Sequence, residues 1–180
     1  MSREVYRPHS TSSKGRCILP IESRLLSKKA FMTWVAEGVY AAGGEHIPKT
    51  WESFSRQTGI QAVLHLSPGR PQVFHGPVPE SFLWLDIEDE TETNIPTRRL
   101  AGEYIRACRQ AGQAILLHSA QGRHRVRWAY VAHQICEGRK LKTVLREAAE
   151  KPWLAPYHTD QPMWQVFYEG IHSPAADHGI

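Results

Sequence analysis

A single short stretch limits the fold of this chain more than any other part of the sequence. The apolar run at residues 114–118 (Ala-Ile-Leu-Leu-His) is followed by the loop 119–125 and then by a helical pattern that extends to Cys136. A short apolar run bounded by a glycine-containing loop is typical of a buried strand. The stretch therefore predicts a strand, a tight loop and a helix in direct succession, which is a building unit of α/β proteins.

The composition of this loop favours a phosphate-sized anion as its ligand. Successive backbone N–H groups can point into such a loop, and the N-terminus of the following helix adds its positive end. Gly122 allows a tight turn without a Cβ atom in the way of the ligand, and Arg125 can offer a two-pronged hydrogen-bonding group. No Gly-Lys-Ser/Thr follows the glycine, so the loop is not of the Walker A type. The residues expected to bind the anion are Ser119, Ala120, Gln121, Gly122, Arg123, His124 and Arg125.

Apolar periodicity predicts further strands and helices on both sides of this unit. Glycine or proline marks the ends of several of these elements. The predicted strands cover residues 34–36, 38–42, 62–66, 82–85 and 114–118, and the predicted helices cover 49–57, 97–110, 125–136, 141–151 and 163–171. No repeat or linker interrupts them, so we expect one α/β domain over residues 31–172, with a polar arm (1–30) before it and a frayed tail (173–180) after it.

Cysteine usage and hydropathy exclude several protein classes. No run approaches the roughly 18 apolar residues of a membrane span, and the first residues lack the apolar core of a secretory signal. The three cysteines have no C-x-x-C spacing, which argues against a disulfide scaffold and a zinc site, so we expect no metal and a cytoplasmic location. Cys108 shares an apolar helical stripe with Leu100, Ala101, Tyr104 and Ile105, and is therefore predicted to be a core residue.

Charge is unevenly distributed along the chain, although the net charge is only +4. Eleven Lys and Arg residues but only two acids lie between Arg98 and Arg146, whereas residues 86–92 contain five acids. This distribution suggests an anionic ligand, with solvated helix faces as the alternative on charge alone. No basic run is interleaved with aromatic residues and no zinc-finger or RNP signature is present, so nucleic acid is not the expected partner.

The 119–125 loop and its preceding histidine resemble the H-C-x-x-G-x-x-R signature of the cysteine-dependent protein phosphatases. His118, Gly122 and Arg125 match the His, Gly and Arg of that signature, and Ser119 occupies the position of the nucleophilic cysteine. Upstream segments resemble the dual-specificity branch of this family. These segments are Trp-Val-Ala-Glu-Gly-Val-Tyr-Ala-Ala-Gly-Gly (34–44), Thr-Gly-Ile-Gln-Ala-Val-Leu-His-Leu (58–66) and Leu-Trp-Leu-Asp-Ile-Glu-Asp-Glu (83–90).

This resemblance implies a central, mostly parallel, twisted sheet of four to five strands flanked by helices, and a reaction without a cofactor. It implies a phosphorylated protein or another phosphomonoester as substrate, and inorganic phosphate or sulfate as a ligand of the loop. Arg125 would hold the phosphate, and His118 would support the loop from behind by donating to its backbone. Asp89 occupies the general-acid position, whereas Asp86 belongs to the strand pattern. We expect the acidic segment to be held near the loop by a basic surface at Arg123, His124 and Arg127.

Two residues depart from the family pattern. Serine replaces cysteine at position 119, and its hydroxyl does not ionise near neutral pH, so we expect almost no covalent turnover. Val126 stands where the family has Ser or Thr. Ser119 is therefore either a natural change, in a phosphate-binding protein without turnover, or an introduced change in an active phosphatase that traps its ligand. Arg123 and His124 beside Arg125 hint at a multiply charged substrate, with solvent-facing side chains as the alternative.

Overall fold

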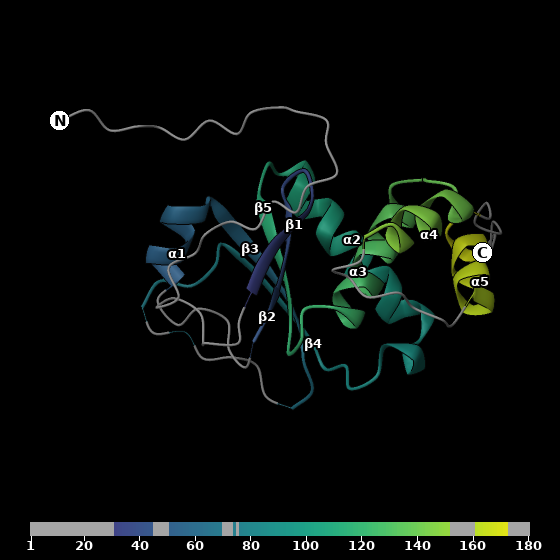
Figure 1. Cartoon of the computed structure of the whole chain (residues 1–180), viewed down its shortest axis with the longest axis horizontal. Coiled ribbons are helices and arrows are strands. Elements are labelled where there is room, and N and C mark those ends of the chain that lie inside the picture. Colours follow the sequence, from purple (N-terminus) through teal and green to yellow (C-terminus); the bar gives the residue numbers. More distant parts are fainter. Residues whose placement is uncertain (1–30, 45–50, 70–73, 75, 152–160, 173–180) are drawn as a thin grey trace, which may run out of the picture.

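The computed structural model describes residues 31–44, 51–69, 74, 76–151 and 161–172. This part of the chain contains five strands, five α-helices and one short 3-10 helix (Figure 1). Strands, singly or in pairs, alternate with helices up to α3, and the last two helices follow it. The strands are β1 (Phe31–Ala36), β2 (Val39–Gly43), β3 (Ile60–Leu66), β4 (Ser81–Leu85) and β5 (Ala114–Ser119). The helices are α1 (Trp51–Thr58), η1 (Glu90–Glu92), α2 (Ile95–Gln110), α3 (His124–Cys136), α4 (Leu141–Ala149) and α5 (Gln161–His172).

The five strands form one sheet in the order β1-β2-β5-β3-β4. β1 and β2 are antiparallel, whereas β2–β5, β5–β3 and β3–β4 are parallel pairs. This confirms the predicted α/β class and the mostly parallel sheet. β5 is the central strand, because β2 and β3 flank it on its two sides.

Alternation of side chains along β5 supplies two separate hydrophobic cores. Ile115 and Leu117 belong to the larger core, on the side of the sheet covered by α2, α3, α4 and α5. Leu116 belongs to the smaller core, together with Trp51 and Phe54 of α1 on the opposite side (Figure 1). Because both faces are covered, the central strand is apolar at nearly every position, as a buried parallel strand requires.

The predicted elements are all present, with ends that differ by a few residues. The helix predicted to start at 97 begins at Ile95, because Asn94 Oδ1 accepts a hydrogen bond from the Thr97 N–H at 2.8 Å and caps the first turn. The helix predicted for 141–151 ends at Ala149. The predicted arm (1–30), the start of the helix at residue 49 and the tail (173–180) lie outside the described residues.

The stripe predicted for α2 is correct in part. Cys108 is 4% exposed and lies in the larger core, where burial raises the pKa of its thiol, so its assignment as a core residue is confirmed. Leu100 is 49% exposed, so its assignment to the buried stripe is wrong. The buried face of this helix instead includes Arg98, three residues before Ala101.

The parallel strands β4, β3 and β5 all end at the same edge of the sheet. The segments that follow β4 and β5, residues 86–94 and 120–123, therefore leave the sheet at the same edge, with the end of β3 between them. Both the acidic run and the glycine-containing loop of the sequence begin here. In the described ranges, no helix combines the length and the apolar character that crossing a membrane requires.

Candidate functional site

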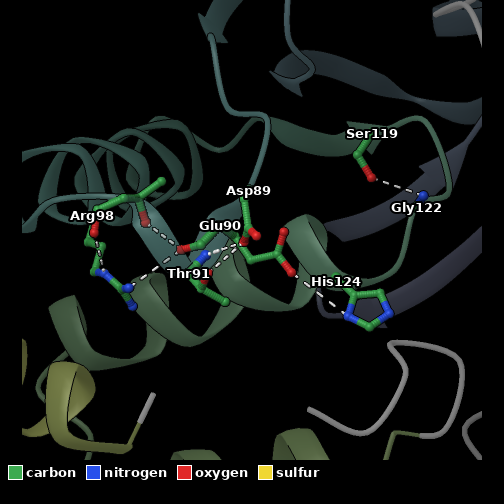
Figure 2. Close-up of polar contacts among 8 residues, drawn as sticks. Asp89, Glu90, Thr91, Arg98, Ser119, Gly122 and His124 are labelled. Carbon is green, nitrogen blue, oxygen red and sulfur yellow. Dashed lines mark hydrogen bonds and ion pairs between the residues drawn. The ribbon is translucent and has the colours of Figure 1, made fainter. Parts of the chain in front are cut away.

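Ser119 is the last residue of β5, and its side chain is turned into the loop that follows. The residue is 2% exposed, and its Oγ accepts a hydrogen bond from the Gly122 N–H at 2.9 Å (Figure 2). The same N–H lies 3.2 Å from the Ser119 carbonyl oxygen. The Gly122 amide therefore points toward the position that carries the nucleophile in the phosphatase signature.

Gly122 is required by its contact with the neighbouring strand. Its φ is +61°, and a Cβ atom at this position would lie 2.5 Å from the carbonyl carbon of Ala42 and 2.6 Å from the backbone nitrogen of Gly43. The tight turn predicted at this glycine is present, and the atoms that a Cβ would meet belong to the backbone of β2. That a Cβ here would also obstruct a ligand stays a prediction. The loop is further tied to the end of β2 by a hydrogen bond from Gly44 N–H to the Ala120 carbonyl at 2.9 Å.

The N-terminus of α3 opens toward this loop. Arg123 is the N-cap residue, and no side chain accepts a hydrogen bond from the first turn of the helix. The amide groups of an uncapped first turn are available to an external acceptor, and they carry the positive end of the helix dipole. The side chains of Arg123 and His124 are exposed.

Arg125 is anchored between two strand ends. Its Nη1 donates to the carbonyl oxygens of Leu66, at the end of β3, and of Ile87, just after β4, each at 3.0 Å. These bonds hold the guanidinium beside Ser119, and both residues line the same hollow. The arginine therefore joins the loop to the segment that carries the acidic residues.

This hollow has a volume of about 290 Å³. Among the described residues its lining combines the sequence-predicted Ser119, Gln121, His124, Arg125 and Asp89 with two further acids. Ala120, Gly122 and Arg123 are not part of this lining. The lining residues are Glu88, Asp89, Glu90, Ser119, Gln121, His124 and Arg125.

Asp89 lies on the acidic segment and is held in one orientation by the residue two positions later. Its Oδ1 accepts hydrogen bonds from the Thr91 N–H and from Thr91 Oγ1, each at 2.8 Å (Figure 2). These two bonds, together with the positive charge of Arg125, hold the pKa of Asp89 below its ordinary value. Asp86 lies outside the hollow, where its carboxylate accepts a hydrogen bond from the Gly69 N–H at 3.1 Å.

Glu90 is a site residue that the sequence analysis did not single out. It is 7% exposed, and its Oε1 lies 3.8 Å from His124 Nδ1 across the hollow (Figure 2). Its backbone carbonyl accepts hydrogen bonds from Thr93 Oγ1 at 2.7 Å and from Arg98 Nη2 at 3.5 Å. Arg98 is fully buried, with its guanidinium 4.4 Å from the centre of the Trp164 ring of α5.

A signal for this arrangement was present in the sequence. Arg98 falls on the apolar stripe of α2, in phase with Ala101 and Ile105. A charge on a buried stripe requires nearby acceptors, and the preceding acidic segment supplies them through its backbone. Nothing in the sequence distinguished Glu90 from the other four acids of that segment.

His118 lies beneath the loop and is fully buried. Its Nδ1 lies 3.1 Å from Nδ1 of His65, the residue at the same level of β3. Burial, with a smaller contribution from the charge of Arg125, lowers the pKa of His65 to about 4. The contact at His118 Nδ1 is thus with a second imidazole, and donation from His118 to the loop backbone stays a prediction.

One predicted contact of the acidic segment is wrong. Arg127 is 7% exposed and lies within α3, so it does not form part of a basic surface beside the loop. Of the predicted surface, His124 does face the segment, at 3.8 Å from Glu90, and Arg98 and Arg125 bind the backbone carbonyls of the segment. Within the ranges that the structure describes, no three His, Cys, Asp or Glu side chains lie close enough together to hold a metal ion.

Comparison with solved structures agrees with this arrangement of strands and loop. Human DUSP28 matches with a TM-score of 0.56 and 16% identity, over 78% of this chain and 91% of that chain. The chain has the dual-specificity phosphatase fold. Human tyrosine phosphatase-like serine/threonine/tyrosine-interacting protein matches with a TM-score of 0.59 and 16% identity, over 78% and 96% of the two chains. PTPMT1 in complex with PI(5)P matches with a TM-score of 0.63 and 13% identity, over the same shares.

No protein-family model and no curated protein matches the sequence. The likeness to the dual-specificity phosphatases therefore rests on the fold of the chain and on the signature residues quoted above.

Proposed function

We propose that this chain binds phosphomonoesters, above all phosphorylated proteins, in the hollow over the 119–125 loop, and that it does not hydrolyse them. The observation that carries the proposal is the pairing of Arg125, anchored at the edge of the hollow, with a buried serine at the nucleophile position. The first feature favours binding of an anion and the second disfavours its turnover.

Binding is supported by two kinds of donor at the hollow. The start of α3, where the N-cap side chain makes no capping bond, offers backbone N–H groups. Arg125 uses Nη1 for its two anchoring bonds, so the edge formed by Nε and Nη2 is the part that can pair with two phosphate oxygens. Hydrogen bonds to charged groups contribute about 1.5–3 kcal/mol each.

Turnover is disfavoured at three positions. The hydroxyl of Ser119 is a poor nucleophile without a base to remove its proton, and its oxygen already accepts a hydrogen bond from Gly122. Asp89 has a lowered pKa, whereas a general acid needs to hold its proton near the working pH. Val126 is fully buried and has no hydroxyl with which to assist hydrolysis of an intermediate.

An active phosphatase whose cysteine has been replaced is the second candidate. It is favoured by the place of Asp89, whose carboxylate lines the same hollow as Ser119 and Arg125. In that case Asp89 protonates the leaving oxygen, and a thiolate at position 119 attacks phosphorus. His118 then supports the loop from beneath.

The test combines binding and turnover. We expect calorimetric titration with inorganic phosphate to show binding that weakens at least tenfold in Arg125→Ala. Arg123→Ala is the matched control, because this exposed residue lies outside the lining, and it is expected to lose less than threefold. Equal losses in the two variants, or no binding by the unmodified chain, would overturn the proposal.

Turnover is then measured with an aryl phosphate on the unmodified chain and on Ser119→Cys. We expect no turnover by the unmodified chain. A silent Ser119→Cys variant that still binds phosphate supports the binding protein. Turnover by that variant, reduced about 10²–10⁴-fold by Asp89→Asn for substrates with a poor leaving group, supports the phosphatase.

A further inference from the structure

The residues around the hollow carry more negative than positive charge, which is unusual for a site that binds anions in general. Among the described residues, its lining contains three acidic residues, Glu88, Asp89 and Glu90, but only one arginine, Arg125. The imidazole of the lining, His124, faces Glu90, with Nδ1 3.8 Å from Oε1. A ligand on the loop therefore lies beside acidic residues as well as beside Arg125.

The three carboxylates differ in what they can contact. Glu90 is buried and directed toward His124, so it belongs to the wall of the hollow. Asp89 and Glu88 are exposed and form its rim. The carboxylate of Asp89 is fixed by Thr91, and its lowered pKa keeps it ionised. We call the pair Glu88 and Asp89 the acidic rim.

The acidic rim determines which groups can stand beside the bound phosphate. A second phosphate within a few ångströms of the rim is repelled, whereas an ammonium or guanidinium group is attracted. The hollow, at about 290 Å³, is at the small end of ligand pockets, which suits one phosphate and a short stem. These features favour a single phosphate over the multiply charged substrate that Arg123 and His124 suggested in the sequence.

Resting on the proposed function, we propose that the ligand is a phosphopeptide segment with Lys or Arg next to the phosphorylated residue. The loop and Arg125 bind the phosphate, and the acidic rim binds the flanking cation. A polyphosphorylated lipid headgroup on an anionic membrane is the disfavoured occupant, because its additional phosphates and its surface would face the same carboxylates.

The experiment uses the full chain and three phosphotyrosine peptides that differ only at the two flanking positions, which are Arg, Ala or Glu. A second set on phosphoserine separates the effect of the flanks from that of the phosphorylated residue. By fluorescence anisotropy at low salt we expect the Arg peptide to bind about fivefold more tightly than the Ala peptide, and the Glu peptide to bind most weakly. The preference is expected to shrink at high salt.

Variants assign this preference to the rim. Glu88→Gln combined with Asp89→Asn should remove the preference for Arg while keeping or improving binding of the Ala peptide. Asn at position 89 can still accept the hydrogen bonds of Thr91. The control is Asp86→Asn, in the same acidic segment but outside the hollow, which should leave the preference unchanged.

The outcomes separate this inference from the proposed function. Failure of all phosphopeptides and of inorganic phosphate to bind overturns the proposed function. Binding that depends on Arg125 but is equal for the three peptides overturns the acidic rim. Tighter binding to phosphatidylinositol-phosphate vesicles than to the Arg peptide also overturns it.

Discussion

The two segments that meet at the hollow are held in place by different means. The 119–125 loop is fixed by backbone contacts: Gly122 presses on β2, and Gly44 donates to Ala120. The acidic segment, residues 86–92, is fixed by side chains from elsewhere, since Arg98 and Arg125 bind its carbonyls. The two segments meet through Arg125, which donates to the Ile87 carbonyl, and through His124, which faces Glu90.

This difference separates two tasks at one site. A loop whose shape depends on backbone packing presents the same donors whatever its side chains are, so its neutral residues tolerate change. A segment held by side chains can be re-anchored or released by single substitutions. Changes that disturb the backbone packing of the loop should therefore affect folding and phosphate binding together. Changes at the acidic segment should affect selectivity and local stability.

Among single substitutions, the largest effect is expected from Gly122→Ala. The added Cβ meets the backbone of β2 at 2.5 Å, and the positive φ adds strain, so the free energy of unfolding should fall by about 4 kcal/mol. Urea denaturation measures it. The control is Gly112→Ala, which has a similar positive φ but no atom within 4 Å of the added Cβ and should cost about 1 kcal/mol. Equal costs would show that contact with β2 does not shape the loop.

Acid should destabilise the core beneath the loop next. His65 and His133 have pKa values lowered to about 4 by burial, against 6.5 in the unfolded chain. The unfolded state binds more protons between these values, so stability is full above pH 6.5 and falls as the pH drops toward 4, by about 3 kcal/mol for each histidine.

Denaturation at several pH values checks this effect. His65→Asn and His133→Gln should each make the free energy of unfolding depend less steeply on pH. The first variant removes the contact with His118 beneath the loop, and the second removes a ring within α3. A slope that both variants retain in full would contradict the assignment to these two side chains.

A smaller effect is expected from Arg98→Met. The change leaves the carbonyls of Glu90 and Thr93 without this donor and removes the stacking on Trp164, so stability should fall by about 2 kcal/mol. Hydrogen exchange should quicken over residues 89–94 more than over the 119–125 loop. Arg99→Met is the control, because this neighbour is exposed and donates to the Gly170 carbonyl of α5, not to the acidic segment, and it should change stability by less than about 1 kcal/mol. An equal increase in the exchange rates of both segments would show that Arg98 does not hold the acidic segment separately from the loop.

The smallest effect is expected from Thr91→Val, which removes one of the two hydrogen bonds on Asp89 Oδ1. The pKa of Asp89 should rise toward its ordinary value. Overall stability should change little, because Asp89 is exposed. Carbon-detected NMR titration of the Asp89 carboxyl measures the shift. An unchanged pKa would show that the backbone bond from Thr91 and the charge of Arg125 are sufficient.

The same distinction explains which parts of the molecule the sequence could predict. The strands, the loop and the α/β class are correct because apolar runs and glycine positions report local backbone conformation. The burial of Arg98 and Glu90 was missed, because Arg98 lies against Trp164 of α5 and Glu90 faces His124 of α3, and both partners are far away in sequence. The contact between Gly122 and β2 was not predicted either, since nothing in the loop itself indicates that β2 lies against it.

The central place of β5 has a consequence for how the chain reaches its native state. β2 and β3 emerge early during synthesis, but each of them pairs with β5. β5 begins at Ala114, more than 45 residues after β3 ends at Leu66. Until β5 inserts between them, the inner edges of both strands are exposed to unproductive pairing. Sheet closure is thus a late event of high contact order, which slows folding. It also completes the hollow at the same moment, because β5 delivers Ser119 and the start of α3 together.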